Sequence, residues 1–406
     1  MVRVTCYLSN HLESPVKPAS RPLLFAALIL AAVNLRPGIT SFAPLIERIA
    51  NELSLSRSVI SLSTALPVLC MGLLAPFAPR LAVRFGLERT ITFCLGLITL
   101  ALALRLAGDS SVLLISTAAL LGAGIAVAGP LLSGFIKRHF VSGVGQVLAW
   151  YSLSMAIGGA AGAVLTFPLM ELFGLGWVGG LAVWAVPALL GVVLWLFIPN
   201  TPEVASQKSA AVESVGLPWN KPRAWLISGF FAIQAGLFYA LATWAVARYH
   251  EAGLSMNHSN ALFGMIMLMG LPSAFIMPWL AQRFDSRPQL LILCGVVTSV
   301  CLAMISFAPL LVPEVWAVAL GLSLSGSFSL SLVLPLYEVN TPLAVSRWTA
   351  MMLFMGYSVG SLTPVLSGLA RDLSGSYQLP FVVLMCLAML MTVLAILMLK
   401  GRKPAD

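Results

Sequence analysis

The segment at residues 23–46, LLFAALILAAVNLRPGITSFAPLI, decides the fold of this 406-residue chain. Its only charged residue is Arg36, and the next charge along the chain is Glu47. At about 1.5 Å per residue in a helix, Arg36 lies roughly 20 Å along the segment, well inside a hydrocarbon layer about 30 Å thick. A guanidinium at that depth is costly unless it is paired or faces water, so it marks a functional site.

The composition is that of an integral membrane protein. The chain is 59% hydrophobic and 9% charged, whereas soluble domains average about 25% charged residues. The formal charge of +9 is compatible with nucleic-acid binding, but the basic residues stand in short loops between apolar segments. We therefore expect a lipid bilayer as partner and no nucleic acid. The six cysteines lack disulfide or metal-ligand spacing, and we expect no cofactor, no metal and a monomer.

Twelve apolar segments of spanning length predict an all-α integral membrane protein with two pseudo-symmetric six-helix bundles. They cover residues 22–46, 56–78, 89–107, 111–136, 142–170, 177–198, 222–248, 257–281, 289–308, 311–337, 345–370 and 378–399. The predicted organisation is a cytoplasmic tail (1–21), an N-terminal bundle (22–199), a cytoplasmic linker (200–221), a C-terminal bundle (222–399) and a second cytoplasmic tail (400–406).

The distribution of Lys and Arg predicts the orientation. With both termini in the cytoplasm, 17 of the 23 basic residues fall in cytoplasmic segments. Five fall on the opposite side, namely Arg48, Arg57, Arg105, Arg248 and Arg371. Positive charge favours cytoplasmic loops, so both termini are expected inside, and Arg36 is the one basic residue left at depth.

An internal repeat supports the division into two halves. The sequence PRLAVRF at residues 79–85 is echoed by PWLAQRF at residues 278–284, which is 199 residues later. The same offset carries Gly122 onto Gly321. Two matches at one offset favour a duplication, and parallel halves of this kind are typical of transporters built from two bundles.

The first of these loops resembles the signature of the major facilitator superfamily, Gly-x-x-x-Asp-Arg-x-Gly-Arg-Arg. The chain keeps Arg84, Gly86 and Arg89, whereas Val83 stands in place of the acid. The second copy keeps Arg283. The resemblance implies the major facilitator fold and a gating role for Arg84, Gly86, Arg89 and Arg283.

Three further runs are more specific. They are NLRP at residues 34–37, TALPV at 64–68 and IKR at 136–138. Together they resemble the cyanate transporter branch of the superfamily, which also includes a 2-nitroimidazole exporter. Substrates vary within that branch, so the resemblance does not name the cargo.

Three interpretations of Arg36 are open. Its guanidinium could donate to backbone carbonyls freed by Pro37, which lacks an N–H and disrupts the helix one turn back. It could pair with a carboxylate on a neighbouring helix, or it could bind an anionic substrate in a central cavity. All fourteen Asp and Glu fall in tails, loops or helix ends, so no carboxylate is evident at the depth of Arg36. We therefore favour the interpretation that Arg36 binds an anionic substrate. Among those acids, Glu338 is expected to pair with Arg347 or Lys137.

Other polar and aromatic residues inside the spans complete the predicted substrate site. In lipid each needs a partner or water, and a shared cavity supplies both, although packing between helices is the alternative for each. The predicted substrate-binding residues are Arg36, Asn34, Thr40, Thr64, Tyr151, Gln234, Tyr239 and Tyr357. The small residues Gly158, Gly159 and Gly162 are expected to let helices approach closely.

These features predict a secondary active or facilitative transporter of the bacterial inner membrane that works by alternating access, with Arg36 in the central site. A small anion such as cyanate is the leading substrate, and the alternative is export of a neutral nitroaromatic or drug-like compound. An enzyme would need paired carboxylates, a His cluster or an activated nucleophile within the spans, and a channel would need a selectivity filter; none is apparent. Since no acid or histidine is expected inside the cavity, facilitated diffusion, exchange or a proton carried by the substrate fits best.

Overall fold

Every element in the described part of the chain is helical. The computed structural model describes residues 20–140, 144–200, 217–284, 286–339 and 342–400. The first half contains α1 (Arg21–Asn34), α2 (Pro37–Thr40), α3 (Ile46–Glu52), α4 (Arg57–Ile60), α5 (Leu62–Leu74), η1 (Ala75–Phe77), α6 (Ala78–Phe85), α7 (Leu87–Leu104), η2 (Arg105–Ala107), α8 (Ser111–His139), α9 (Val144–Leu172), α10 (Trp177–Ala182) and α11 (Ala185–Leu196). The second half contains α13 (Pro222–Glu251), α14 (Met256–Arg283), α15 (Arg287–Phe307), α16 (Pro313–Glu338), α17 (Pro342–Gly360), α18 (Leu362–Ser374) and α19 (Gln378–Lys400).

Within these residues, 12 stretches are long and apolar enough to cross a membrane. The prediction of a twelve-span, all-α membrane protein is confirmed. Two predicted boundaries differ most: the first span ends at Thr40 rather than residue 46, and the second runs to Phe85 rather than residue 78. Most of both predicted tails and of the linker lies outside the described residues, so the domain boundaries stay predictions.

The first span is interrupted twice. α1 ends at Asn34 and α2 begins at Pro37, because a proline cannot donate the next helical hydrogen bond and disfavours helix in the residue before it. Turns then cover residues 41–45, around Pro44, before α3 begins. The first interruption places Arg36 in non-regular backbone, which is tolerated at this depth only where it borders protein or a cavity.

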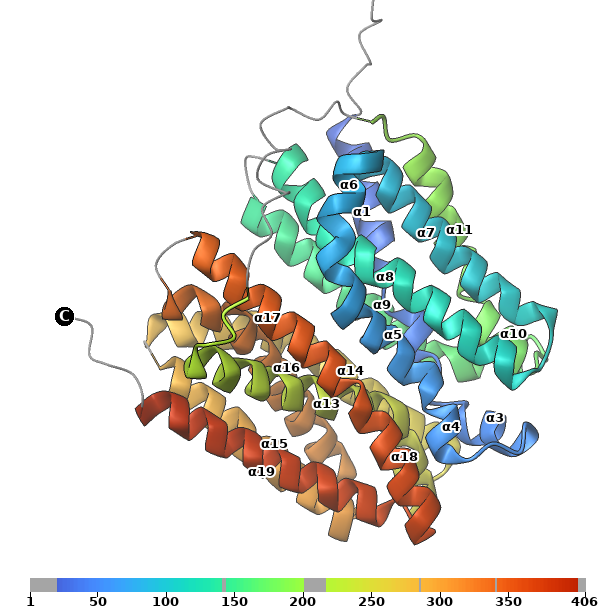
Figure 1. Cartoon of the computed structure of the whole chain (residues 1–406). Helices are drawn as coiled ribbons and strands as arrows, with labels where there is room; N and C mark the ends of the chain where they lie inside the picture. The colour runs from blue at the N-terminus through green and yellow to red at the C-terminus, as the bar shows by residue number, and fades with distance from the viewer. Residues whose placement is uncertain (1–19, 141–143, 201–216, 285, 340–341, 401–406) are drawn as a thin grey trace, which may run out of the picture.

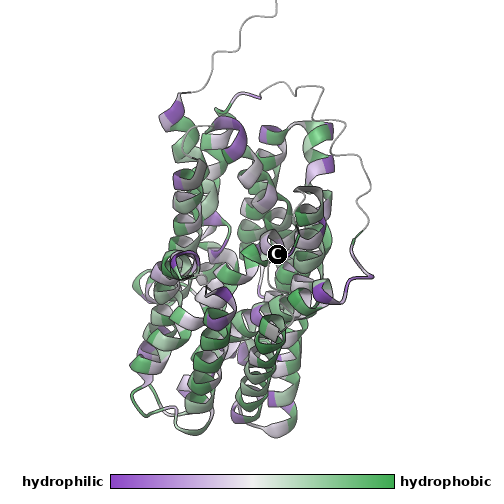
Figure 2. Cartoon of the chain, turned by 90° about the vertical axis from the view of Figure 1, so that its left-hand side faces the viewer, coloured by the Kyte–Doolittle hydropathy of each residue, from purple (hydrophilic) through white to green (hydrophobic). Residues whose placement is uncertain are grey.

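The helices form two bundles, α1–α11 and α13–α19 (Figure 1). The bundles diverge toward the side where α1 begins and α19 ends, and they meet where α3, α4 and α18 lie. We name these sides the open end and the closed end. Figure 2 shows that hydrophobic residues dominate the helices, with the most hydrophilic residues mainly near helix ends and connections.

The repeat seen in the sequence returns as a repeated contact. A Cβ atom built on Gly122 of α8 would lie 2.4 Å from the Cα atom of Pro67 in α5. A Cβ atom built on Gly321 of α16 would lie 2.4 Å from the carbonyl oxygen of Ile266 in α14. Pro67 and Ile266 are separated by the same 199 residues, so both halves use the same close crossing of helices.

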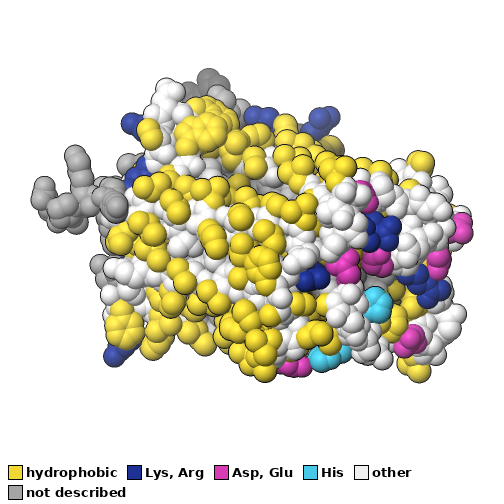
Figure 3. All heavy atoms as spheres, turned by 90° about the horizontal axis from the view of Figure 1, so that it is seen from below, with side chains coloured by type: hydrophobic (Ala, Val, Ile, Leu, Met, Phe, Trp, Pro, Cys, Tyr) yellow, Lys and Arg dark blue, Asp and Glu magenta, His cyan; other side chains and the backbone are white. Residues whose placement is uncertain are grey.

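Among the pairs of helices that join the two bundles are α5 with α17 and α9 with α14. Gly72 of α5 packs so closely on α17 that a Cβ atom there would lie 2.8 Å from the backbone nitrogen of Ser358. A Cβ atom on Gly264 of α14 would lie 2.5 Å from the side-chain Cγ2 atom of Val164 in α9. Figure 3 shows acidic and histidine side chains gathered toward one end of a mostly hydrophobic surface, whereas Lys and Arg side chains occur at both ends.

Candidate functional site

A cavity of about 580 Å³ lies between the two bundles. Its lining comes from the first bundle at the α1–α2 break and on α9, and from the second bundle on α13, α14, α16 and α17. The contributing parts of α9, α14 and α16 are those nearer the open end, so the cavity extends from the middle of the molecule in that direction. Most lining residues are apolar, and the polar ones are Arg36, Thr40, Ser152, Gln234, Tyr239, Ser325, Ser329 and Tyr357.

Arg36 carries the one charge among the described residues that line the cavity. Its Cζ atom lies 5.3 Å from the centroid of the Phe238 ring, which makes a cation–π contact with the opposite bundle. Within the described part of the chain, no carbonyl or carboxylate accepts a hydrogen bond from its guanidinium. Neither the backbone interpretation nor the ion-pair interpretation of Arg36 therefore has a contact in this conformation.

Glycines of α9 hold the Arg36 segment in place. A Cβ atom on Gly158 would lie 2.0 Å from the carbonyl oxygen of Val33, and one on Gly162 would lie 2.4 Å from Oγ1 of Thr40. No side chain fits at either position, so the broken first span packs directly against α9. The predicted packing role of these glycines is confirmed, and it brings Arg36 and Thr40 to the cavity wall.

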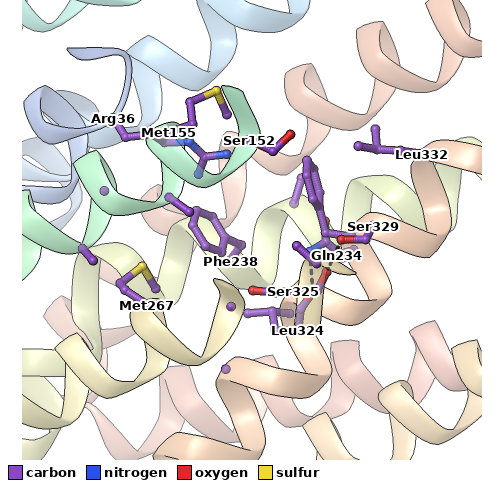
Figure 4. A pocket seen from close by; sticks show the side chains of 18 of the residues that line it. Arg36, Ser152, Met155, Gln234, Phe238, Met267, Leu324, Ser325, Ser329 and Leu332 are labelled. Atoms are coloured by element: carbon purple, nitrogen blue, oxygen red, sulfur yellow. Dashed lines mark hydrogen bonds between the residues drawn. The ribbon is translucent and has the colours of Figure 1, made fainter. Parts of the chain in front are cut away.

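An aromatic cluster forms the opposite wall. Phe238 and Tyr239 are in edge contact with centroids 5.2 Å apart, and Tyr239 and Tyr357 are in edge contact at 6.4 Å. Gln234 lies one helical turn before Phe238 on α13, and its Nε2 donates to the carbonyl of Leu324 at 3.1 Å. The wall can therefore hold a ring by edge-to-face contacts, and it faces the guanidinium of Arg36 (Figure 4).

Of the predicted substrate-binding residues, Arg36, Thr40, Gln234, Tyr239 and Tyr357 line the cavity. The other three, Asn34, Thr64 and Tyr151, do not line it. Asn34 donates from Nδ2 to the carbonyls of Leu30 and Pro187, at 2.7 and 3.0 Å, and so ties α1 to α11. Tyr151 points toward α8, with Oη 3.5 Å from the carbonyl of Gly129.

Sequence reasoning missed Ser152 and the two α16 serines as wall residues. Ser152 follows Tyr151 directly, so the helical phase of α9 was misjudged by one position. Ser325 and Ser329 recur at a spacing of four from Gly321, which places all three on one face of α16. That spacing was the available signal.

The third displaced residue, Thr64, closes the cavity toward the closed end. Thr243 of α13 donates to Thr64 of α5 at 2.9 Å, and both side chains are buried. Nearby, the Tyr239 hydroxyl lies 3.7 Å from Sδ of Met71, also on α5. The two bundles are thus hydrogen-bonded to each other directly beyond the binding space.

Asp372 fastens the closed end itself. Its carboxylate, at the end of α18, accepts hydrogen bonds from the backbone nitrogens of Arg57 and Ser58 and from Oγ of Ser58, all at 2.9 Å. A Cβ atom on Gly368 would lie 2.5 Å from the carbonyl oxygen of Arg57. An acid of the second bundle therefore satisfies the unpaired N–H groups that begin the second span of the first bundle.

A second set of contacts surrounds Tyr377, between α18 and α19. Its hydroxyl donates to Glu47 of the first bundle, and Glu47 also accepts from Arg57 at 2.6 Å. Its backbone nitrogen donates to Glu251 at 2.9 Å. Burial, and then the Glu47 carboxylate, raise the pKa of Tyr377 above its ordinary value. The hydroxyl consequently stays protonated and remains a donor across the interface.

The residues of the predicted gating loop lie at the open end. Arg84, Arg89 and Arg283 are exposed, and the Cζ atom of Arg84 lies 5.2 Å from the centroid of the Phe85 ring. Gly86 joins α6 to α7 with φ of 90°, a conformation that favours glycine. No group of three or more His, Cys, Asp or Glu able to hold a metal occurs among the described residues.

One expectation about a charged residue is wrong, and a second charged residue is buried without a partner. Glu338 pairs with Arg223, whose Nη2 donates to it at 3.0 Å, rather than with Arg347 or Lys137. Arg105, one of the five basic residues predicted on the side opposite the cytoplasm, is only 1% exposed, and none of its three side-chain nitrogens has a hydrogen-bond partner among the described residues. Its Cζ atom lies 5.3 Å from the centroid of the Phe42 ring.

Comparisons with known proteins agree with this architecture. A family model described as Major Facilitator Superfamily matches residues 27–361. The cyanate transport protein CynX of Escherichia coli (strain K12) is 32% identical over 354 residues, which cover 87% of this chain and 91% of that protein. A 2-nitroimidazole transporter of the same organism is 28% identical over 380 residues, which cover 92% and 94% respectively.

Among solved structures, a similar one is a bacterial homolog of the human lysosomal transporter Spinster in an inward-facing and occupied conformation. It matches with a TM-score of 0.80 at 15% identity and covers 95% of this chain and 100% of that one. At this identity the likeness shows the fold alone.

Proposed function

Because the chain belongs to the Major Facilitator Superfamily and is a membrane transporter rather than an enzyme, we propose that it carries a small anion by alternating access. Arg36 binds the anion in the cavity between the bundles. The observation that carries this proposal is a guanidinium, facing that cavity, with no acceptor among the described residues.

The energetics favour a ligand at Arg36. A planar guanidinium offers N–H donors in a fixed fork that matches an oxyanion, and Phe238 covers one of its faces at 5.3 Å. Away from bulk water such donors are stabilised only by an acceptor. An anion entering the cavity supplies that acceptor, and cyanate is the first candidate because the relative at 32% identity is a cyanate transport protein.

The state of the molecule fits one half of a transport cycle. Contacts at Asp372, Tyr377 and Thr64 seal the closed end, while the cavity extends toward the open end. With both termini in the cytoplasm, as the basic residues predict, the open end faces the cytoplasm. Rocking of the bundles would then break the closed-end contacts and expose Arg36 to the other side.

Coupling in this proposal does not use a protein carboxylate in the cavity. Among the described lining residues none is Asp, Glu or His. Facilitated diffusion, exchange, or movement of a proton bound to the substrate therefore fits the site. Uptake that persists when an imposed pH gradient is collapsed, at constant substrate concentration, supports facilitated diffusion or exchange.

The test of the proposal is cyanate uptake and counterflow in proteoliposomes containing wild-type protein, Arg36→Ala or Arg36→Lys. One charge-assisted hydrogen bond contributes about 1.5–3 kcal/mol, so Arg36→Ala should raise the half-saturation concentration for cyanate uptake by about 10- to 150-fold. Arg36→Lys keeps the charge but not the fork and should fall between. Arg48→Ala, on an exposed residue of α3, is the matched control. Wild-type uptake by correctly inserted Arg36→Ala would refute the proposal.

A second candidate function is export of a neutral nitroaromatic or drug-like compound. The aromatic wall formed by Phe238, Tyr239 and Tyr357 favours it, as does the 2-nitroimidazole transporter at 28% identity. In that case Arg36 would hold a nitro oxygen. Counterflow of labelled 2-nitroimidazole, with cyanate as competitor, distinguishes the two functions.

A further inference from the structure

Gln234 holds an unused acceptor at the cavity wall. The residue is 1% exposed and lines the cavity. Its Nε2 donates to the Leu324 carbonyl, while Oε1 is buried and has no hydrogen-bond partner among the described residues. A carbonyl can only accept, so Leu324 fixes the amide orientation and leaves the oxygen unpaired. A buried acceptor without a donor is unfavourable, and a donor group on a bound ligand would remove that cost.

The unpaired oxygen and Arg36 flank the same ring. Gln234 and Phe238 are four residues apart on α13, so they share a helical face. Phe238 is also the ring that covers the Arg36 guanidinium at 5.3 Å. In Figure 4 the Phe238 side chain lies between Arg36 and Gln234. One helical turn rises about 5.4 Å, so Gln234 lies about that far from Phe238 along the axis of α13, and the two residues border neighbouring parts of the cavity wall.

The size and lining of the cavity favour a ligand larger than a three-atom anion. Cavities that bind drug-sized molecules measure about 300–1,000 Å³, and this one measures about 580 Å³ with mostly apolar walls. Phe238, Tyr239 and Tyr357 present edges and faces suited to a ring. Cyanate alone would leave most of that wall in contact with water.

We propose that Gln234 is a specificity-determining residue that accepts a hydrogen bond from the substrate, and that the substrate is a small aromatic anion bearing an N–H or O–H group. The anionic end lies on Arg36, the ring packs against Phe238, and the donor reaches Oε1 of Gln234. This inference rests on the proposed function for the anionic end, but the donor requirement is independent of it.

The test uses full-length protein in proteoliposomes and three labelled probes: 4-hydroxybenzoate, benzoate and 4-methoxybenzoate. Only the first carries a donor on the ring. We expect its half-saturation concentration to be about 10- to 100-fold lower than those of the other two, because they leave Oε1 unpaired. A fourth probe, 3-hydroxybenzoate, tests a shorter distance between the carboxylate and the hydroxyl group.

Gln234→Met keeps the side-chain size and removes the acceptor. The half-saturation concentrations of this variant for 4-hydroxybenzoate and for benzoate should therefore be equal. Gln289→Met, on an exposed residue of α15, is the matched control and should keep the wild-type preference. The comparison of probes on wild-type protein needs no variant, so misfolding of Gln234→Met cannot obscure the result.

Equal half-saturation for the hydroxylated and methoxylated probes would overturn the inference, as would transport of cyanate with no transport of any aromatic probe. A preference that survives in Gln234→Met would overturn it as well. Failure of the proposed function has a different signature. Arg36→Ala would then transport benzoate normally, whatever the effect of the ring hydroxyl.

Discussion

Removing the Asp372 carboxylate should shift the protein toward a state in which the closed end is open. Its oxygens accept three hydrogen bonds at 2.9 Å from the start of α4 in the other bundle. Charge-assisted hydrogen bonds contribute about 1.5–3 kcal/mol each when sheltered. Asp372 is exposed, and water screens it and replaces part of the loss. Loss of a helix-capping side chain costs about 0.5–2 kcal/mol, which is the better guide.

For Asp372→Ala we therefore expect the equilibrium between closed and open to change by about 2- to 30-fold toward open. Asp372→Asn keeps one acceptor oxygen and should produce a smaller shift. A spin-label pair at Glu52 and Leu373, introduced after replacing the six native cysteines, reports the distance across the closed end. Pulsed dipolar spectroscopy in nanodiscs should show a second, longer distance that gains population in the order wild type, Asn, Ala.

Asp109→Ala is the matched control for this measurement. Asp109 is an exposed acid in the loop before α8 and has no hydrogen bond or ion pair to the other bundle among the described residues. It should leave the distance distribution unchanged. An unchanged distribution in Asp372→Ala would refute the reasoning, because the three hydrogen bonds would then contribute nothing to closure. A shift of the same size in Asp109→Ala would refute it too, since the effect would be one of net charge.

Three further outcomes follow from the same structure. Gly158→Ala would place a Cβ atom 2.0 Å from the carbonyl of Val33 and should lower the melting temperature by several degrees, whereas Gly96→Ala, which meets nothing within 4 Å, should leave or raise it. Arg105→Met should raise the melting temperature, because an unpaired buried charge is replaced by apolar packing; a large decrease would show that Arg105 has a stabilising partner. The pKa of Tyr377 is raised in the closed state, so its contribution to closure is complete below about pH 10 and lost as pH rises further. The closed fraction measured by the same spin labels should fall there in wild type and stay level in Tyr377→Phe.

The fold was predictable because a membrane span can be recognised from the apolar composition of one continuous segment. Each span needs about 20 apolar residues to cross the bilayer, and this requirement leaves a continuous signal that the structure confirms in 12 helices. The repeat at 199 residues was equally visible, and it marks the contact of Gly122 with Pro67 that recurs at Gly321 and Ile266. The largest boundary errors are in the first two spans, because turns around Pro44 end the first helix early and the second span continues to Phe85.

The cavity was partly predictable, because the sequence shows how deep a residue lies in the membrane but not which way its side chain points. Arg36 stands out because a charge in an apolar run is costly wherever it points. Tyr151 and Asn34 were chosen by the same reasoning about depth, yet they turn away from the cavity to pack on α8 and α11. Which face of a helix borders the cavity depends on the rotation of that helix, and nearly uniform apolar spans do not encode it.

The closed end could not be predicted at all. Asp372 meets Arg57 and Ser58 from more than 300 residues away, and Glu47 meets Tyr377 from 330. Each of these residues lies at or near a helix end. Polar and charged side chains are common there because they are solvated, so their presence does not by itself indicate a contact. The cost of a buried charge is a property of one position, so the sequence reveals it; the benefit of a contact belongs to two positions, and only folding brings them together. The same distinction explains why the unpaired Oε1 of Gln234 became visible only in the structure.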